Sequence, residues 1–501
     1  MAQETKEAFS NDLASNIKAL RVHLRDCSDV IYRTVRIDHE TRGLVVFLSN
    51  MVDMEAVRTD IIGKLQQFAA PLDASEPILW HIPVPNVTAH DNLNDAVTAV
   101  MQAEALLVID GHASAYSFGI SQGKRRSVQE PSSETVVRGP REGFTEDLGV
   151  NLSLVRNKLK SDKLKTIEYT IGRESKTKVI LAYFEHIARP EVIQEVRRRL
   201  DGIDIDAVLE TGYIEELIED DPSSPFPQFQ YTERPDNAAA QLLEGRFVLF
   251  VDGTPFVLIA PVTAWQFLQA SEDYYERYMI GNLLRWLRLF FLFIALFLPG
   301  TYVAVLTFHH DMLPTSLVLS IAASRESIPF PVLVEALIME VSFEALREAG
   351  IRLPKAIGQA VSILGALVIG QSAVQAGIVS APMVIVVSLT GIASFCLPRF
   401  NFAITIRLLR FPIMILAGIF GLFGMVAGTV LLAAHLSRLS SFGQPYLEGV
   451  APYEKWDNKD ILVRSPWWEL GSRPRRLGRE NPKRMNKETS SKHNYNQIPE
   501  W

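Results

Sequence analysis

Cysteine is nearly absent from the chain, and neither sign of charge is in large excess. The 501 residues include only two cysteines, Cys27 and Cys396. Two distant cysteines exclude the disulfide framework of a small secreted domain and a cysteine-rich metal site. The 50 basic and 57 acidic side chains give a formal net charge of −7, which argues against a protein dedicated to binding nucleic acid.

The sequence also lacks the short motifs that carry most enzyme chemistry. It contains no HExxH, CxxC, GxGxxG, GxSxG or Walker A motif, so the chemistries that these motifs mark are not indicated. The closest approach, SFGISQG at 117–123, lacks the GK[ST] ending of a phosphate loop and is interpreted as a turn. Asp110 and Gly111 follow a predicted strand, where an ordinary turn explains them. We therefore predict no catalytic residue, no cofactor and no metal ion.

Long uncharged runs fill much of the second half of the chain, at residues 289–308, 356–397 and 411–434. A helix rises about 1.5 Å per residue, so about 20 residues cross a hydrocarbon core of about 30 Å. The middle run is about twice that length and is predicted to turn near Pro382, which interrupts a helix. These runs predict a transmembrane helical domain over 286–436. Its four predicted spans are 289–308, 357–379, 382–397 and 411–434.

Residues 328–349 are apolar in their first half but carry several charges. Glu340 and Glu344 are four residues apart, so a helix places them on one face, and Arg347 follows Glu344 at a spacing that permits an ion pair. One interpretation is an amphipathic helix at the membrane interface. The other is a re-entrant or spanning helix whose acidic face lines a polar path or a subunit contact, because carboxylates inside a membrane usually face a bundle interior or water.

Two further groups of residues inside the uncharged runs are candidates for helix contacts. Gln371 and Gln375 are four residues apart and share a helix face. In lipid each amide needs a hydrogen-bond partner, so the pair either bonds to neighbouring helices, which we favour, or lines a pore. The last run contains small residues that permit close helix packing, which favours a bundle or an oligomer over an isolated anchor. These residues are Gly418, Gly421, Gly424 and Gly428.

The first 245 residues carry most of the charge of the chain, and no internal repeat is evident among their helix and strand patterns. This length suits two α/β subdomains, which we place at 1–135 and 136–245. Residues 246–285 are predicted to form strands and a helix that connect to the membrane part, and 437–501 to form a basic tail. The predicted fold class is an α+β N-terminal region followed by an α-helical polytopic transmembrane bundle.

The orientation of the predicted spans depends on the charged segments around them. The start, MAQETKEAFSND, has no apolar core of a signal sequence, and Arg277, Arg285 and Arg288 precede the first span. Basic residues favour the cytoplasmic side, so the N-terminal region is predicted to be cytoplasmic. Four spans place the tail inside and five place it outside. We favour an inside tail, because its basic stretches from Arg473 suit an anionic inner leaflet.

A set of short strings runs through both halves of the chain in a fixed order. They are RGPREGF at 138–144, TERPD at 232–236, LLEGR at 242–246, DGTPF at 252–256, EDYYERY at 272–278 and ESIPFPVLVEALIMEVSFEALREAGIRLP at 326–354. Together they resemble the GerA family of spore germination proteins, specifically the A subunit of the nutrient germinant receptor. The resemblance extends from about residue 20 to the tail, and no single string carries it.

The resemblance implies a location, partners and a function. A subunits of this family are found in the inner membrane of the dormant spore, with a permease-like B subunit and a lipoprotein C subunit. The B subunit is the expected nutrient-binding component. The A subunit is expected to form a homo-oligomer with a cation-conducting path whose opening triggers germination, and its N-terminal region is expected to face the spore core.

Three other functions are alternatives to the receptor subunit. A paralogous group resembles these A subunits but works with the dipicolinate-release apparatus of the spore. A small-solute transporter is less favoured, because four or five spans without an evident repeat are few for a transporter built from repeated halves. A membrane-anchored enzyme is less favoured because the catalytic motifs are missing.

Overall fold

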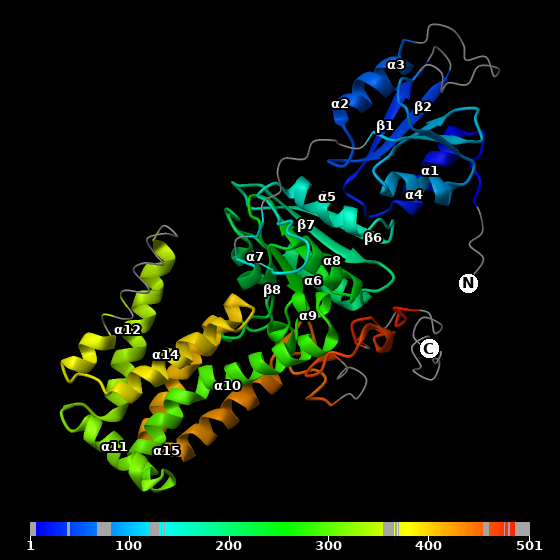
Figure 1. Cartoon of the computed structure of the whole chain (residues 1–501). Coiled ribbons are helices and arrows are strands. Elements are labelled where there is room, and N and C mark those ends of the chain that lie inside the picture. Colours follow the sequence, from blue (N-terminus) through cyan, green and yellow to red (C-terminus); the bar gives the residue numbers. More distant parts are fainter. Residues whose placement is uncertain are drawn as a thin grey trace, which may run out of the picture. The chain divides into compact units, whose positions relative to one another are not determined.

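The computed structural model divides the chain into two compact units (Figure 1). Residues 1–222, 229–261 and 467–501 form the first, here called the α/β unit, and residues 223–228 and 262–466 form the second, the helical unit. The residues that the structure describes are 7–37, 41–67, 82–120, 130–131, 133–134, 136–353, 365, 368, 370–453, 460–474, 476–478 and 481–485.

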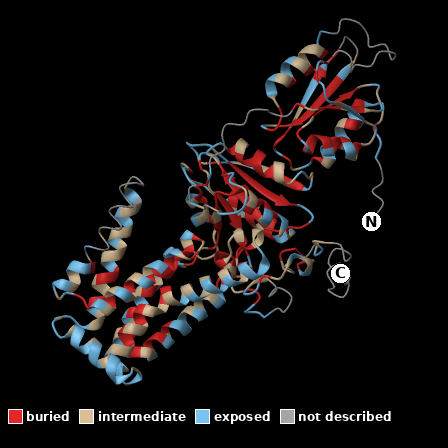
Figure 2. Ribbon diagram, viewed as in Figure 1, coloured by how far each residue is buried: buried red, intermediate tan, exposed pale blue. Residues whose placement is uncertain are grey.

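The first subdomain of the α/β unit is a five-stranded antiparallel sheet of order β1-β2-β4-β5-β3. Alternate residues of β2 face opposite sides: Leu44 and Val46 join the core under α1 and α4, whereas Val45 and Phe47 join the core under α2 and α3. Both faces are therefore buried (Figure 2), which explains the unbroken apolar runs in the central strands. The elements are α1 (Leu13–His23), β1 (Val30–Arg36), β2 (Arg42–Leu48), α2 (Met54–Ala56), a π-helical segment (Val57–Ile62), α3 (Gly63–Leu65), β3 (Val87–His90), α4 (Leu93–Met101), β4 (Ala105–Ile109) and β5 (Ala115–Phe118).

The second subdomain is another five-stranded antiparallel sheet, of order β6-β7-β9-β10-β8. Helices α5 and α8 pack on one face through Leu152, Val155 and Leu242. Both α6 and α8 begin with proline, whose fixed φ suits the first turn of a helix. The elements are α5 (Leu148–Lys158), β6 (Leu164–Ile171), β7 (Thr177–Phe184), α6 (Pro190–Asp201), α7 (Thr211–Ile218), β8 (Gln230–Thr232), α8 (Pro235–Leu243), β9 (Phe247–Val251) and β10 (Val257–Ala260).

The two subdomains have the same connectivity. Each begins with a helix and a β-hairpin, and in each the next strand, β3 or β8, lies at the far edge of the sheet beside the last strand. The sequences where α1 and α5 begin also match, FSNDLASN at 9–16 and FTEDLGVN at 144–151. The expectation that the chain has no internal repeat is therefore wrong. The repeat consists of a shared topology and a few shared contacts, which sequence patterns alone do not display.

An Asp-Gly pair makes the same contact in both copies. Asp110, after β4, accepts a hydrogen bond from the backbone N–H of Leu13 at 3.1 Å. Asp252, after β9, accepts one from the backbone N–H of Leu148 at 3.4 Å. The following glycines have φ of +82° and +89°, a region that glycine enters without a steric penalty. Asp110 and Gly111, predicted to form a simple turn, and their counterparts Asp252 and Gly253 therefore join the end of a strand to the start of a helix.

The second sheet extends beyond the predicted subdomain boundary at residue 245. Strand β9 pairs with both β7 and β10, and β10 pairs with β8. Residues 247–260 were predicted to be part of a connector at 246–285, yet they form the middle of this sheet. Strand β9 is buried along its whole length, so it needs neighbours on both sides, which a connector would not provide.

A buried ion pair joins the two subdomains within the α/β unit. Arg156 of α5 donates from Nε and Nη2 to the two carboxylate oxygens of Asp29, at 2.7 and 2.9 Å, and their side chains are 1% and 4% exposed. Thr166 of β6 donates its hydroxyl to Asp29 at 2.9 Å. Its backbone N–H bonds to the carbonyl of Asp26 at 2.7 Å. The joint therefore combines a bidentate ion pair with backbone pairing.

The predicted tail at 437–501 is divided between the units: residues 437–466 belong to the helical unit and residues from 467 onward to the α/β unit. Arg473 donates from Nε to the carbonyl of Leu243 at 2.7 Å, and Arg484 pairs with Glu244. A Cβ on Gly245 would lie 2.7 Å from the carbonyl oxygen of Leu477, so the tail approaches α8 as closely as glycine permits. The basic stretch predicted to bind a lipid surface thus uses two of its arginines inside the chain.

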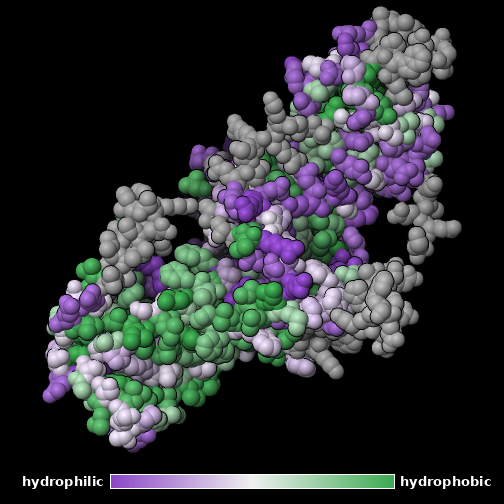
Figure 3. Space-filling model, in the orientation of Figure 1, coloured by the Kyte–Doolittle hydropathy of each residue, from purple (hydrophilic) through white to green (hydrophobic). Residues whose placement is uncertain are grey.

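The helical unit contains two helices that are long and apolar enough to cross a membrane, α10 and α15, within the described part of the chain. Figure 3 shows apolar side chains gathered over this unit, among them the exposed Leu283, Trp286, Phe290 and Phe293 of α10. Residues 357–364, 366–367 and 369 of the predicted span 357–379 lie outside the described residues. The elements are a 3₁₀ helix (Ala264–Leu268), α9 (Glu272–Tyr275), α10 (Tyr278–Phe308), a 3₁₀ turn (His310–Met312), α11 (Thr315–Arg325), α12 (Val332–Arg352), α14 (Ala381–Phe395), α15 (Phe400–Arg438), β11 (Ser440–Ser441) and β12 (Gln444–Pro445).

Helix α15 reverses direction at Gly421, where φ is +64° and ψ is −145°. The ring of Phe226 lies 6.3 Å from that of Phe402 and 6.0 Å from that of His435, so the two ends of α15 lie together. The element is therefore a helical hairpin with a first arm, 400–420, and a second arm, 422–438. The single helix predicted over 411–434 is divided between these arms, because Gly421 adopts a conformation that is strained for other residues.

Contacts between side chains fix the directions of the other long helices. Leu333, near the start of α12, lies beside Gly418, while Glu344, eleven residues later, lies 3.6 Å from Arg407; α12 therefore runs antiparallel to the first arm. Ser380 precedes α14 and contacts Glu335, and Ser394 contacts Arg347. Hence α14 runs in the same direction as α12.

Candidate functional site

Helix α12 presents buried carboxylates to its neighbours. Of its two predicted candidates, Glu340 is more deeply buried than Glu344. Glu340 is 1% exposed, and its Oε2 accepts a bond from Nη1 of Arg410 in the first arm at 2.5 Å. Its Oε1 and the Nε and Nη2 of Arg410 have no hydrogen-bond partner among the described residues. The pair is therefore desolvated but only partly satisfied, an arrangement that lowers its contribution to stability.

Glu344 is the second predicted candidate, and two arginines share it. Its Oε1 lies 2.8 Å from Nη1 of Arg347 on α12 and 3.6 Å from Nε of Arg407 on the first arm. The Arg347 guanidinium also lies 4.9 Å from the centre of the Phe395 ring, and its Nη2 lies 3.4 Å from the hydroxyl of Ser394. The ion pair expected between Glu344 and Arg347 is present and extends to two further helices.

A third carboxylate, Glu335, was not among the predicted candidates. It is fully buried and accepts a bond from the backbone N–H of Ser380 at 2.6 Å and another from its hydroxyl. Arg325 of α11 lies 3.2 Å from it. The sequence feature that could have identified Glu335 as a candidate is its position, as a charged residue in the first turn of a mostly apolar helix. With Glu340 and Glu344 it forms what we call the α12 carboxylate row.

The α12 carboxylate row is surrounded by more positive than negative charge. Four guanidinium groups contact its three carboxylates. Such a set holds helices together and does not by itself attract a cation. The four arginines are Arg325, Arg347, Arg407 and Arg410.

Gln371 and Gln375 lie apart from the α12 carboxylate row. Both side chains are exposed on the surface of the single chain, whereas Glu340 is buried. Among the contacts of the described residues, neither glutamine makes a hydrogen bond to Glu340 or Glu344. The four predicted polar residues therefore form two groups, one internal and one open to a membrane, a partner or a second copy.

The predicted glycine series packs helices within the chain. A Cβ on Gly418 would lie 2.6 Å from a methyl group of Leu333 on α12. A Cβ on Gly424 would overlap the carbonyl oxygen of Leu416, and one on Gly428 would lie 3.0 Å from the Leu416 side chain. Gly421 forms the reversal itself. The series therefore closes the α15 hairpin and seats α12 against it.

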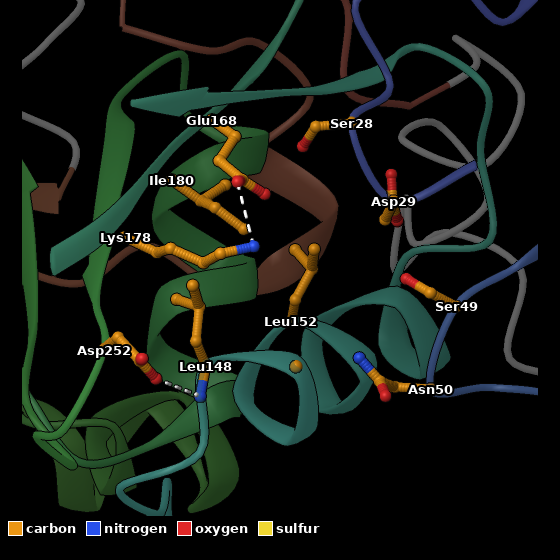
Figure 4. Close-up of a pocket in the computed structure, with 11 residues that line it drawn as sticks. Ser28, Asp29, Ser49, Asn50, Leu148, Leu152, Glu168, Lys178, Ile180 and Asp252 are labelled. Atoms are coloured by element: carbon orange, nitrogen blue, oxygen red, sulfur yellow. Dashed lines mark hydrogen bonds and ion pairs between the residues drawn. The ribbon is translucent and has the colours of Figure 1, made fainter. Parts of the chain in front are cut away.

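The α/β unit has a pocket of about 240 Å³ between its two subdomains (Figure 4). Lys178 extends to Glu168 at 3.0 Å, Asp252 holds the backbone N–H of Leu148, and Asp29 binds Arg156. These charged groups already have partners in the chain, so the lining does not select a ligand by charge. The lining residues are Ser28, Asp29, Ser49, Asn50, Leu148, Gly149, Leu152, Glu168, Lys178, Ile180 and Asp252.

The chain is similar to one known protein family and to several of its members. The model of the family described as Bacillus/Clostridium GerA spore germination protein matches residues 18–476. The chain belongs to the GerA family. This GerA-family chain is 52% identical to the uncharacterized membrane protein YfkQ of Bacillus subtilis, over 98% of this chain and 96% of that one. It is 44% identical to spore germination protein KA of the same species, over 97% and 91% of the two chains.

A solved structure with a related sequence covers part of this GerA-family chain. It is the crystal structure of the N-terminal domain of the A subunit of the Bacillus megaterium spore germinant receptor GerK3. The sequence identity is 34%, the match covers 52% of this chain and 98% of that one, and the TM-score is 0.41.

Within the described residues of the present chain, no group of three or more His, Cys, Asp or Glu side chains could hold a metal ion.

Two carboxyl groups, one on α7 and one on the residue that follows it, have raised pKa values in the GerA-family chain. Burial, together with the nearby Glu219 and Glu210, raises the pKa of Glu215 to about 7 from its ordinary 4.5. Burial, together with Glu216 and Asp221, raises the pKa of Glu219 to about 7 as well. Between pH 4.5 and 7 the folded chain binds protons that the unfolded chain releases, so stability falls as the pH rises through this window.

Replacing Glu215 by glutamine is expected to raise the stability of the α/β unit at pH 8 by about 2 kcal/mol, because the neutral amide avoids the cost of a buried charge. Near pH 4.5, where the folded Glu215 is protonated, the two proteins should be equally stable. Scanning calorimetry of the detergent-solubilised full chain at both pH values measures this difference. Glu174→Gln at an exposed position is the control, and an equal gain at both pH values would contradict the prediction.

Proposed function

We propose that this chain is the membrane-embedded A subunit of a spore germinant receptor. The observation that carries the proposal is the family match over residues 18–476, supported by the two apolar helices. The spore germination proteins among its relatives support the same assignment. As a receptor A subunit, the chain functions in the spore inner membrane with a permease-like B subunit and a lipoprotein C subunit.

The proposed topology has six crossings. Helices α10, α12 and α14 and both arms of α15 account for five of them, each about 22–45 Å long. Because α12 and α14 run in the same direction, the chain returns between them; Gly365 beside Leu346 and Gly377 beside Ser327 lie on this return. Residues 261 and 467, which flank the main segment of the helical unit, belong to the same α/β unit, in agreement with an even number of crossings. With an even number, the tail is proposed to lie on the cytoplasmic side, like the α/β unit.

The charges of α12 are compatible with a crossing helix. A carboxylate exposed to lipid is costly, whereas a carboxylate paired with arginine inside a bundle is tolerated. Glu335, Glu340 and Glu344 each contact an arginine of the chain. This pairing favours the spanning interpretation of residues 328–349 over a helix lying at the interface.

The receptor subunit is further proposed to form a homo-oligomer that conducts cations. The exposed Gln371 and Gln375 are the candidates for the pore or for the contact between copies, because an exposed amide within lipid lacks a partner until another helix or water provides one. The α12 carboxylate row, with its excess of arginine, is not the proposed ion path.

Recording from the purified chain in a potassium gradient tests this proposal. We expect an oligomer with discrete cation-selective openings, and Gln371→Leu combined with Gln375→Leu should lower the unitary conductance at least about twofold. Thr429→Val, at an exposed polar position of α15, is the matched control and should conduct normally. A monomer that stays silent even with the permease-like and lipoprotein partners present would contradict the channel, and saturable solute uptake would favour a transporter.

A further inference from the structure

Helix α12 carries a carboxylate every four residues, at Glu340, Glu344 and Glu348, along the side that approaches the first arm of α15. That arm offers two arginines three residues apart. In the observed register Glu340 faces Arg410 at 2.5 Å and Glu344 faces Arg407 at 3.6 Å. Glu348, one turn beyond Glu344, has no arginine of α15 opposite it.

A shift of α12 by four residues, about 6 Å or roughly one helical turn, produces a second register with the same number of ion pairs between α12 and the first arm. Glu344 then takes the place of Glu340 opposite Arg410, and Glu348 takes the place of Glu344 opposite Arg407. The helices are antiparallel and the four-residue spacing is close to one turn, so the same two arginines pair with α12 in both registers, whereas Glu340 leaves Arg410. The sequence of α12 therefore encodes two positions against a single pair of arginines.

We propose that α12 and the first arm of α15 form a two-position ion-pair ratchet that gates the subunit. The inference rests on the proposed channel function: the observed register is the resting one, and the shifted register is the conducting one. One-turn displacements between packed elements are an established type of switching transition, because packed interfaces have discrete alternatives.

The ion pair between Glu340 and Arg410 contributes little to the stability of the resting register. One oxygen of Glu340 and two nitrogens of Arg410 are buried without partners, and buried charges that are only partly satisfied contribute little net stability. Glu348 is 60% exposed and pairs with Arg352 on its own helix, a contact that costs little to release. Two registers of similar free energy are the condition for a switch.

Contacts at the start of α12 restrain the shift. Glu335 holds the backbone N–H of Ser380 at 2.6 Å and lies 3.2 Å from Arg325, so these bonds must break when the helix moves. Leu333 packs on Gly418, and the shift replaces it with Leu337, one turn later on the same face. The residue beside Gly418 therefore reports which register is occupied.

Disulfide trapping in the full chain measures the two registers directly. Leu333→Cys with Gly418→Cys should cross-link in the resting register, and Leu337→Cys with Gly418→Cys in the shifted one. Cys27 and Cys396 are first replaced by serine. We expect Glu340→Gln to raise the ratio of shifted to resting cross-links about tenfold, and Glu348→Gln to lower it about tenfold. Each fold-change corresponds to a free-energy difference of about 1.4 kcal/mol.

The outcomes separate the ratchet from the channel. Glu326→Gln, at an exposed position after α11, is the control and should leave the ratio unchanged. A ratio that Glu348→Gln does not move, or a shifted cross-link that never forms, would overturn the ratchet. In a potassium gradient, Glu340→Gln should have a higher open probability than the unmodified chain, and Glu348→Gln a lower one. If the wild-type chain never conducts while the cross-link ratio of the cysteine variants responds as expected, the channel is overturned and the ratchet is retained.

Discussion

Replacing Arg156 by methionine is expected to destabilise the α/β unit by about 3–5 kcal/mol, because it leaves the carboxylate of Asp29 buried without its cation. Both side chains are nearly inaccessible to water, so solvent cannot replace the lost bonds. The remaining donor to the Asp29 carboxylate is the hydroxyl of Thr166, which does not neutralise the charge. Urea unfolding of the detergent-solubilised chain, followed by limited proteolysis of the α/β unit, measures the loss.

A second substitution separates the lost charge partner from lost packing. When Asp29 is replaced by leucine in the Arg156→Met background, the uncompensated charge disappears, and we expect at least half of the stability to return. Arg198→Met on α6, where the arginine side chain is 71% exposed, is the control and should change stability by less than about 0.5 kcal/mol. A loss of less than about 1 kcal/mol for Arg156→Met would show that the pair does not hold the subdomains together.

The strands and helices of the α/β unit follow from local patterns that a single sequence displays. Apolar runs such as those of β4 and β9 predict buried strands, and Pro190 marks the start of α6. The duplication was not visible in the same way. Its two copies share a topology and a few residues, among them Asn16 and Asn151, whose side chains bond to the backbone six residues earlier. Because the two copies share so few residues, the duplication is recognised from the structure and not from the sequence.

The helical unit shows a different limit of reasoning from sequence. Hydropathy located α10, α14 and α15, because uncharged length alone identifies a candidate span. The reversal at Gly421 was missed, since a glycine inside an apolar run is as common in a straight transmembrane helix as in a turn. The partner of Glu340 was missed because Arg410 is seventy residues away in the sequence. The spacing of Glu344 and Arg347, which is local, predicted their ion pair correctly.

The position of the tail within the chain is recorded by contacts and not by charge counting. Basic residues near a predicted span could be counted toward either orientation, because four and five spans gave opposite results. The contacts of Arg473 and Arg484 with residues 243–244 place the described part of the tail within the α/β unit. The proposed even number of crossings therefore rests on where the tail packs, a property that hydropathy does not record.

The α15 hairpin gives the prediction with the largest expected effect on the helical unit. Replacing Gly424 by alanine adds one methyl group at a point where it overlaps the carbonyl oxygen of Leu416 in the other arm. A flexible side chain could rotate away, but a backbone carbonyl can be relieved only by moving the arms apart, so we expect a loss of about 3 kcal/mol. The apparent melting temperature of the detergent-purified chain, followed by size-exclusion chromatography after heating, should fall by roughly 6–12 °C.

Gly391 provides a matched control, because it lies in α14 and a Cβ there would meet no atom within 4 Å. Gly391→Ala adds the same methyl group to a helix, where alanine is favoured over glycine by about 1 kcal/mol, so the melting temperature should stay the same or rise. The two variants differ only in what surrounds the added carbon. Equal melting temperatures for Gly424→Ala and Gly391→Ala would mean that the two arms of α15 do not pack against each other, and that residues 411–434 form one continuous helix.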